Sequence, residues 1–522
     1  MKSVIYNGVL LIALVGCPCL SLSAQDSVAD NKVKDVTPAN AGVEKTDNKN
    51  DLKEKKDAKK KEGKVNERVL QLESQVRKMQ AELETLKKLL LSGSQNPTLD
   101  EKTAKSDTGV PVAKSPKDRA TATASKKKAS KNDLSFDVGS YKITPYGIIF
   151  FNAYANNNGT NNVDDPLWAT SNPAGNASAS GRQTRLGVKI EGGRIGDANV
   201  SGVVEADFYG GLPAVGVGEN MGVLRFRVAK VKLAWEKTSL QIGQDWVIFA
   251  PNSPKSLAAA AIPQFAAAGN LWSRLPQIRV ERTFGKGFKW QGAVLAPGTG
   301  DFPLGGATPL LLQPGTGSAS KTPFFQSRIS YTNANFFGSG KGGTIGFAGH
   351  YGRSRVTSGA RSNEIDSWGA AADWNIPLVK RVSLSGEAFY GKNLAGFQGG
   401  IFQGYNTDFG TSMDYEGGSS VPGIRGIGTR GGWTQLGWNL PTLDDRLSIY
   451  GSMGIDDPHN EDLVTRSGRN FRTRNFGYAF DAIYKVSKNL SLGWEFRRLE
   501  TSYFFTPKKE ANHMNFGAAF KF

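Results

Sequence analysis

The last twelve residues, Ala511 to Phe522, read A-N-H-M-N-F-G-A-A-F-K-F. Apolar residues occupy every second position, and polar or small residues lie between them, which is the period-two pattern of a β-strand with two different faces. The apolar positions are Met514, Phe516, Ala518, Phe520 and Phe522. We interpret this stretch, with its aromatic last residue, as the closing strand of a β-barrel. The alternative is an ordinary edge strand.

The composition suits a large antiparallel β protein. The chain has 522 residues, 62 of them glycine, and 39% of its residues are hydrophobic. Charged residues make up 21% of the chain, which argues against a helical membrane protein. The net charge of +18 does not require a nucleic-acid partner, and we expect none.

Residues 1–24 have the features of a secretory signal peptide. A basic residue precedes a short apolar run, Val9 to Val15, and the segment has a small residue, Ala24, at its end. Cleavage after Ala24 would remove both cysteines, Cys17 and Cys19, so we expect no disulfide framework. The alternative is a lipoprotein signal that leaves Cys17 lipidated.

The next three segments predict an arm outside the main domain. Residues 25–64 are polar and lack periodicity, which predicts a disordered spacer. In residues 65–91, apolar side chains recur at alternating intervals of four and three, the pattern of a coiled coil rather than a lone amphipathic helix. They are Val65, Val69, Leu72, Val76, Met79, Leu83, Leu86 and Leu90. Residues 92–133 read as a low-complexity linker, and the lysine run at 126–128 is either solvated or contacts an anionic partner.

Residues 134–522 predict sixteen antiparallel strands, from period-two alternation between turn signals. We place the strands, each within about 2–4 residues, at 145–155, 181–192, 199–210, 222–236, 239–249, 276–284, 288–296, 324–333, 343–352, 364–375, 380–391, 431–440, 446–456, 472–486, 489–501 and 511–522. Long and short connections alternate almost throughout.

This alternation of connection lengths is typical of a bacterial outer-membrane barrel, which has short periplasmic turns and long outer loops. A soluble sandwich has no reason to sort its loops in this way. The predicted fold is therefore an all-β membrane protein, a 16-stranded antiparallel transmembrane β-barrel with an N-terminal α-helical coiled coil in the periplasm.

The two faces of the predicted strands differ in polarity. In 185–191, 200–209 and 490–497, charged or small residues alternate with apolar ones. Charges in the middle of a membrane-crossing strand are tolerated only where they face water, so the second face must line an aqueous lumen. Aromatic residues near strand ends on the apolar parity indicate interfacial girdles, with ordinary core packing as the alternative. They are Trp235, Trp290, Trp374, Trp438, Tyr484 and Trp494.

Five features of the sequence resemble a known family. They are the coiled coil at Val65–Leu90, the strand Leu224–Ala229, the strand end Gly243–Trp246, the strand Pro276–Val280 and the terminal Phe522. Together they resemble the DcaP-like porins. The resemblance implies a trimeric outer-membrane channel with sixteen strands, associated with uptake of dicarboxylic acids and related anions. Phosphate- and sugar-selective porins share parts of these motifs.

Basic residues on the lumen parity are Arg185, Lys189, Arg225, Arg227, Arg279, Arg328 and Arg497. Most of them lie in strands around the third long loop, Ala250 to Leu275, which contains two charged residues, Lys255 and Arg274, and no acid. In general porins the corresponding loop folds inward and narrows the channel. Here it would add only apolar and positive surface, which favours anions, including carboxylates and dicarboxylates.

Acidic residues share the lumen parity, so the arginines can also be paired within the wall. The acids are Glu191, Glu205, Asp207, Glu281, Asp373, Glu387 and Glu495. We expect a subset of four arginines to be unpaired enough to bind a carboxylate, for which the planar guanidinium group is well suited. These four are Arg185, Arg225, Arg227 and Arg279.

An enzyme is less well supported by the sequence. Three histidines, His350, His459 and His513, have no nucleophile motif or metal-ligand spacing beside them, so we expect neither catalysis nor a cofactor. The acid pairs Asp164–Asp165 and Asp456–Asp457 could hold a cation, but adjacent acids in exposed loops are usually hydrated.

The main alternative to a porin is a non-conducting structural or adhesive barrel, tethered to the cell envelope by the coiled coil. The expected partners are outer-membrane lipid, small anionic solutes and further copies of the chain in a homotrimer. A contact with peptidoglycan is left open by the sequence.

Overall fold

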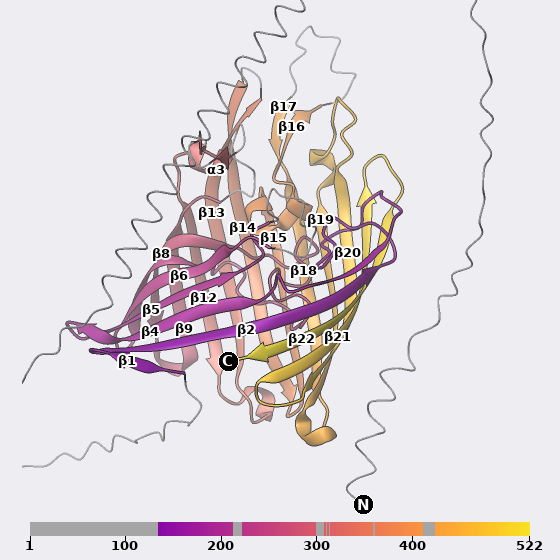
Figure 1. The fold of residues 1–522 in the computed structure, drawn as a ribbon. Coiled ribbons are helices and arrows are strands. Elements are labelled where there is room, and N and C mark those ends of the chain that lie inside the picture. Colours follow the sequence, from indigo (N-terminus) through magenta and orange to yellow (C-terminus); the bar gives the residue numbers. More distant parts are fainter. Residues whose placement is uncertain are drawn as a thin grey trace, which may run out of the picture. The chain divides into compact units, whose positions relative to one another are not determined.

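The computed structural model describes residues 134–211, 222–298, 307–308, 311–312, 314–358, 361–410 and 423–522. The predicted signal peptide, spacer, coiled coil and linker, residues 1–133, lie outside the described residues. Within the described part of the chain, sixteen strands form one closed antiparallel barrel (Figure 1). This agrees with the strand number predicted from the sequence.

The barrel strands are β2 (Tyr141–Asn156), β4 (Arg185–Ile195), β5 (Ala198–Asp207), β6 (Arg225–Ala234), β7 (Thr238–Trp246), β8 (Arg274–Thr283), β9 (Phe288–Leu295), β12 (Phe324–Asn333), β13 (Gly343–Ser358), β14 (Arg361–Val379), β15 (Val382–Lys392), β18 (Gly428–Asn439), β19 (Leu447–Pro458), β20 (Arg472–Lys485), β21 (Leu490–Tyr503) and β22 (Lys509–Lys521). The shorter strands are β1 (Phe136–Val138), β3 (Asn176–Ser180), β10 (Ala307–Thr308), β11 (Leu311–Leu312), β16 (Tyr405–Phe409) and β17 (Gly423–Gly426). The helical segments are α3 (Thr316–Ala319), α4 (Gly399–Phe402), η1 (Gly285–Gly287), η2 (Phe336–Gly338), η3 (Ala395–Phe397), η5 (Leu443–Asp445) and η6 (Asn460–Asp462). Among the described residues, no helix has the length and apolar character that crossing a membrane requires.

The terminal stretch closes the barrel, as its alternating pattern predicts. Strand β22 pairs with β21 on one side and with β2 on the other, so the last strand meets the first. At the seam, Phe522 and Gly147 exchange two backbone hydrogen bonds, both 3.2 Å long. The closure leaves no exposed strand edge along this seam.

The outward face of the barrel carries an apolar band. Large apolar side chains that point outward are exposed, including Ile149, Phe226, Ile242, Ile278, Phe347, Leu436, Met453 and Phe480. Of the predicted girdle residues, four tryptophans are between 38% and 47% exposed, whereas Trp374 and Tyr484 are half-buried. The four are Trp235, Trp290, Trp438 and Trp494. Such a band is what a barrel wall needs in order to contact lipid.

One connection differs from the sequence prediction. A loop was expected between residues 352 and 364, but β13 and β14 stay paired up to Ser358 and Arg361. On their outward face, Arg353 lies 3.3 Å from Glu364 and 3.1 Å from Asp366. Cross-strand charge pairs stabilise the polar outward face of this hairpin, whereas Val356 and Ile365 are buried on its inward face. Its largely polar composition resembles that of a loop.

Candidate pore and constriction

The connection between β7 and β8, residues 247–273, folds into the barrel and crosses its lumen. We call it the constriction loop. The Asn252 amide donates to Glu387 Oε1 on β15 at 2.7 Å, and the Lys255 amide donates to Gln435 Oε1 on β18 at 2.8 Å. Strands β15 and β18 lie on the opposite side of the barrel from β7 and β8. The loop therefore connects two sides of the barrel. We call the side that contains β4 to β8 the near wall and the side that contains β14 to β21 the far wall.

Gln183, just before β4, holds the tip of the constriction loop against the near wall. Its Nε2 donates to the Ala258 carbonyl at 2.6 Å, and its Oε1 accepts from the amides of Ala260 and Ala261 at 2.7 and 2.9 Å. The Gln183 side chain is buried. A buried amide that makes three hydrogen bonds is costly to replace, so this side chain fixes where the tip lies.

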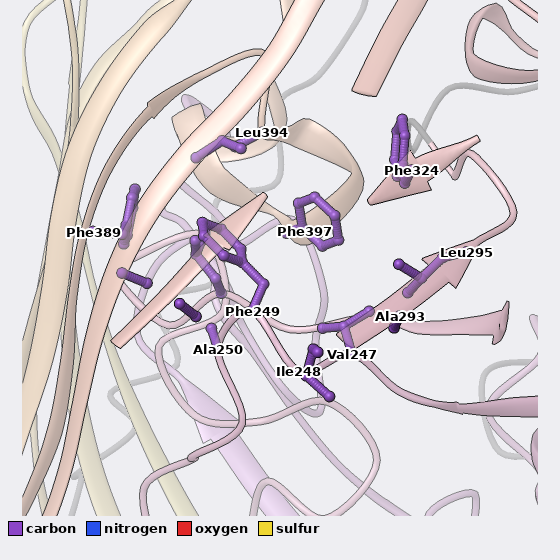
Figure 2. Packing of buried hydrophobic residues seen from close by; sticks show 13 residues of the cluster. Val247, Ile248, Phe249, Ala250, Ala293, Leu295, Phe324, Phe389, Leu394 and Phe397 are labelled. Atoms are coloured by element: carbon purple, nitrogen blue, oxygen red, sulfur yellow. The ribbon is translucent and has the colours of Figure 1, made fainter. Parts of the chain in front are cut away.

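Two further long connections also fold into the lumen. The 157–175 and 393–410 segments pack against the constriction loop through one apolar cluster, formed by Leu167, Ala266, Ala267, Trp272 and Ile401. A second cluster joins the loop residue Phe249 to Phe324 and Phe397 (Figure 2). These clusters fill part of the interior beside β12 to β15. The interior is too wide for wall side chains alone to fill, and loops occupy this part of it.

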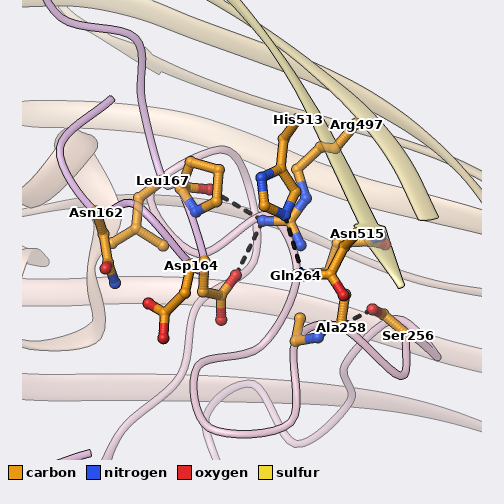
Figure 3. Close-up of polar contacts among 12 residues, drawn as sticks. Asn162, Asp164, Leu167, Ser256, Ala258, Gln264, Arg497, His513 and Asn515 are labelled. Carbon is orange, nitrogen blue, oxygen red and sulfur yellow. Dashed lines mark hydrogen bonds and ion pairs between the residues drawn. The ribbon is translucent and has the colours of Figure 1, made fainter. Parts of the chain in front are cut away.

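Five acidic residues of the far wall are covered by these loops or paired within the wall. They are Asp373, Glu387, Asp456, Asp481 and Glu495, and each is at most 3% exposed. Ser256 of the constriction loop donates to Glu495, and Gln264 Nε2 lies 3.2 Å from Asp481 Oδ2. Figure 3 shows Ser256 and Gln264 in this region with Arg497. Because loop donors occupy these carboxylates, the acids do not face open lumen.

Replacing a covered acid should therefore leave ion selectivity nearly unchanged. Glu387→Gln keeps an oxygen acceptor for the Asn252 amide while it removes the charge. We expect the zero-current potential of the variant in a salt gradient to match that of the wild type. A clear shift toward anions would mean that Glu387 does face the ion path.

A cavity of about 500 Å³ lies between the constriction loop and the near wall. Its wall side is lined by Arg185, Arg227, Lys230 and Arg279, with Asp245 as an acidic neighbour. Its loop side is mostly apolar and includes Val247, Ile248, Pro251, Pro254, Ala259, Ala260 and Pro263. The charged side chains that line this cavity are thus mainly positive.

The four arginines expected to include unpaired members all have carboxylate partners, so none of them is unpaired. That a subset of them binds a carboxylate stays a prediction. Arg225 Nη2 lies 2.8 Å from Asp207, and Arg227 lies 2.8 Å from Glu205 and 2.6 Å from Asp207. Arg185 lies 3.6 Å from Glu205. Arg279 lies 2.8 Å from Asp245 and 3.3 Å from Glu281. The pairing arises because strand register places acids of neighbouring strands beside the arginines, as in Arg225↔Asp207.

Two other predicted arginines lie away from the cavity. Arg328 is buried and makes two hydrogen bonds to Asp373. Arg497 is fully buried and is bonded to Asp165, Glu495 and the Pro166 carbonyl. Both arginines therefore hold the covered side of the lumen together rather than contact solutes.

Arg274, Lys255 and Lys189 have no ion-pair partner among the described residues. The Arg274 guanidinium lies 4.7 Å from the Trp246 ring centre and 5.0 Å from that of Trp272. The ammonium groups of Lys189 and Lys255 lie 5.0 Å and 6.0 Å from tyrosine rings. Aromatic faces stabilise a cation without neutralising it. These three charges therefore stay available to attract anions.

The sequence prediction missed Lys230 and Lys232, which also lie on the lumen face. Lys230 Nζ lies 2.8 Å from Asp245 and Lys232 Nζ 3.4 Å from Glu281. The β5–β6 register shifts between Glu205 and Ala206, because a bulge at Arg227 inserts one residue and exchanges the two faces of β6 after it. In residues 225–232, R-F-R-V-A-K-V-K, the basic residues lie at odd positions up to Arg227 and at even positions from Lys230. This change of parity was the signal in the sequence that could have indicated the bulge.

In the acid pairs that seemed suited to an ion, Asp164, Asp165 and Asp456 are buried, whereas Asp457 is half-buried and paired with Arg430. Asp164 Oδ1 lies 2.7 Å from both Arg182 Nη2 and the Tyr209 hydroxyl, and Asp456 accepts from the amides of Gly400 and Ile401. Burial, and then the neighbouring carboxylates, raise the pKa of the Tyr209 phenol well above its usual value, so it remains a donor. Among the described residues, no group of three or more His, Cys, Asp or Glu side chains could hold a metal ion.

Comparisons with known proteins bear on the fold. No family model and no curated protein matches the sequence. Among solved structures, the outer membrane channel DcaP of Acinetobacter baumannii is 17% identical, with 74% of this chain and 99% of that chain covered and a TM-score of 0.54. An anion-selective porin from Comamonas acidovorans is 12% identical over 73% of this chain and 100% of that chain, with a TM-score of 0.45. OmpF of Salmonella typhi in complex with daunomycin is 10% identical over 74% and 100%, with a TM-score of 0.47. The chain thus has the fold of the DcaP outer-membrane channel, which confirms the fold that the resemblance to DcaP-like porins predicts.

Proposed function

We propose that the chain forms an outer-membrane porin for passive diffusion of small hydrophilic solutes, and that it prefers anions, including carboxylates and dicarboxylates. The fold shared with the DcaP channel supports a channel. One observation carries the anion preference: loops cover the acids of the far wall, whereas four basic side chains and one acid line the cavity on the near wall. A narrow passage with excess positive charge concentrates anions and repels cations.

The zero-current potential of the purified protein in a planar bilayer tests this proposal. In a potassium chloride gradient, we expect a potential whose sign shows that chloride is more permeant than potassium. Liposome swelling then compares mono- and dicarboxylates with phosphate and with neutral sugars of similar size. Faster swelling with carboxylates supports the proposal, and equal rates for sugars and carboxylates contradict it.

A non-conducting structural or adhesive barrel is the second candidate. The packing of three connections inside the lumen favours it, because that packing reduces the open cross-section. Single-channel recording separates the two candidates. Discrete conductance steps support the porin, and their absence in a folded, inserted preparation supports the structural barrel.

The proposal places a homotrimer in outer-membrane lipid. The exposed apolar band on the outward face supports contact with lipid or with other copies of the barrel. The coiled coil that would join the copies in the periplasm lies outside the described residues and remains a prediction, as does contact with peptidoglycan. The mass of the detergent-solubilised protein measures the number of copies.

Removing the charge of Arg274 should weaken the anion preference. A unit charge at about 4 Å contributes on the order of 1 kcal/mol in water, which corresponds to roughly a fivefold change in permeability ratio. We therefore expect Arg274→Gln to lower the chloride-to-potassium permeability ratio by up to about that factor, whereas Arg274→Lys keeps most of it. If Arg274→Gln and Arg274→Lys give the same ratio as the wild type, Arg274 does not act on permeating ions.

A further inference from the structure

Three arginines share one backbone oxygen at the tip of the constriction loop. The Ala261 carbonyl accepts from Arg225 Nη2 at 3.2 Å, from Arg227 Nη1 at 3.4 Å and from Arg274 Nη2 at 3.2 Å. A fourth arginine, Arg185, donates to the neighbouring Ala260 carbonyl at 2.8 Å. The three bonds to Ala261 are long for N–H···O hydrogen bonds, so each is weak.

The charges around this oxygen are not balanced by the described carboxylates. Arg185, Arg225 and Arg227 share two acids, Glu205 and Asp207, and Arg274 has no ion-pair partner among the described residues. Two further acids of this region are already paired, Asp164 with Arg182 at 2.7 Å and Asp245 with Lys230 and Arg279 at 2.8 Å. Four guanidinium groups therefore face two carboxylates and the neutral carbonyl oxygens of Ala260 and Ala261.

A carboxylate would be a better acceptor at this point than a carbonyl. Hydrogen bonds between guanidinium and carboxylate groups are shorter and roughly twice as strong as bonds between neutral groups. We propose that the point where Arg225, Arg227 and Arg274 converge is a carboxylate-binding subsite, which the Ala261 carbonyl occupies until a permeating carboxylate displaces it. This inference rests on the proposed anion preference. It adds that the constriction loop changes its contacts when a carboxylate solute binds.

Displacement would loosen only the tip of the loop. Without the arginine contacts, the Ala258–Ala261 segment is held mainly by Gln183. The part of the loop at the far wall keeps its bonds from Asn252 to Glu387 and from Lys255 to Gln435. A bound carboxylate would thus widen the passage beside the cavity while the rest of the loop stays in place.

Hydrogen–deuterium exchange on the full-length, detergent-solubilised protein tests this subsite. The probe is succinate, compared with chloride at equal ionic strength. We expect succinate to speed exchange severalfold at the Ala260 and Ala261 amides, because a tip that is held by Gln183 without the arginine contacts opens more often. The Asn252 and Lys255 amides are the internal reference and should exchange at the same rate in both salts.

The Arg274→Gln variant completes the test. It removes one of the three donors, so the effect of succinate at Ala260 and Ala261 should shrink or disappear, whereas the reference amides stay unchanged. Unchanged or slower exchange at the tip of the wild-type loop in succinate would overturn the inference. The zero-current potential of the same preparation distinguishes failure of this inference from failure of the proposed function. If the channel prefers anions but succinate does not change the exchange rate, only the displacement of the Ala261 carbonyl is rejected. If the channel does not prefer anions, the proposed function is rejected.

Discussion

Replacing Arg225 and Arg227 together by alanine is expected to remove most of the anion preference of the channel. The two arginines neutralise Glu205 and Asp207, to which they are bonded at 2.6 to 2.8 Å. Their removal deletes two positive charges and leaves both carboxylates without their closest partners. Arg185 and Arg274 then balance Glu205 and Asp207, so the excess positive charge at this point is lost and the preference for anions falls.

The measurement is the zero-current potential in a salt gradient, which should fall toward zero. Breaking a buried ion pair by removing one partner costs about 3–5 kcal/mol, so circular dichroism must first show that the variant is a folded barrel. A fourfold variant that also carries Glu205→Gln and Asp207→Asn is the matched control, because it removes all four charges. It removes as many negative as positive charges, so it should keep most of the anion preference. If the double variant keeps the wild-type potential, these arginines do not set selectivity.

Replacing Gly147 by valine should disrupt closure of the barrel. A Cβ atom at Gly147 would lie 2.6 Å from the Arg185 carbonyl oxygen and 2.6 Å from the Phe522 ring. Gly147 is also the residue whose backbone bonds to Phe522 at the seam. Because the Arg185 carbonyl belongs to the pairing of β4 with β2, it cannot move without disturbing that pairing. We therefore expect the free energy of unfolding to fall by at least about 1–3 kcal/mol, the usual cost of overpacking.

Folding into detergent micelles measures this effect, through the fraction of protein that migrates as a compact barrel on a gel without heating. Gly349→Val is the control, because Gly349 lies in β13 on the outward face and a Cβ there would meet nothing within 4 Å. Gly147→Val should reduce the compact fraction strongly, and Gly349→Val should not. Equal folding of both variants would contradict the role given to the seam.

The wall of the barrel could be predicted from the sequence because its signals are local. The alternation of apolar and polar residues within each strand and the alternation of connection lengths between strands led to sixteen strands and to the closing role of Ala511–Phe522. The loop predicted between β13 and β14 was wrong because most residues of this hairpin are polar, and the two buried apolar residues, Val356 and Ile365, give too short an alternation to indicate strands.

The arrangement inside the lumen could not be predicted, because it depends on contacts between residues far apart in the chain. Glu387 and Glu495 share the lumen parity with the arginines, but only the fold shows that the constriction loop covers them. Lys230 was missed because a single bulge changes the face of half a strand. Basic residues near the third long loop could be predicted from the sequence, and pairing with acids such as Glu205 and Asp207 was the alternative to unpaired arginines. Only the strand register decides between the two.

The most direct test of the account is whether ions pass along the basic wall and not along the acidic one. Single cysteines are introduced by Lys230→Cys, which replaces a residue that lines the cavity, and by Ser452→Cys, a small change at a buried lumen-side position where the serine hydroxyl donates to Gln264 of the constriction loop. The current through each variant is recorded while a negatively charged thiol reagent is added. The account predicts rapid modification and a reduced current for Lys230→Cys and almost no change for Ser452→Cys. Fast modification of Ser452→Cys together with an unreactive Lys230→Cys would contradict it.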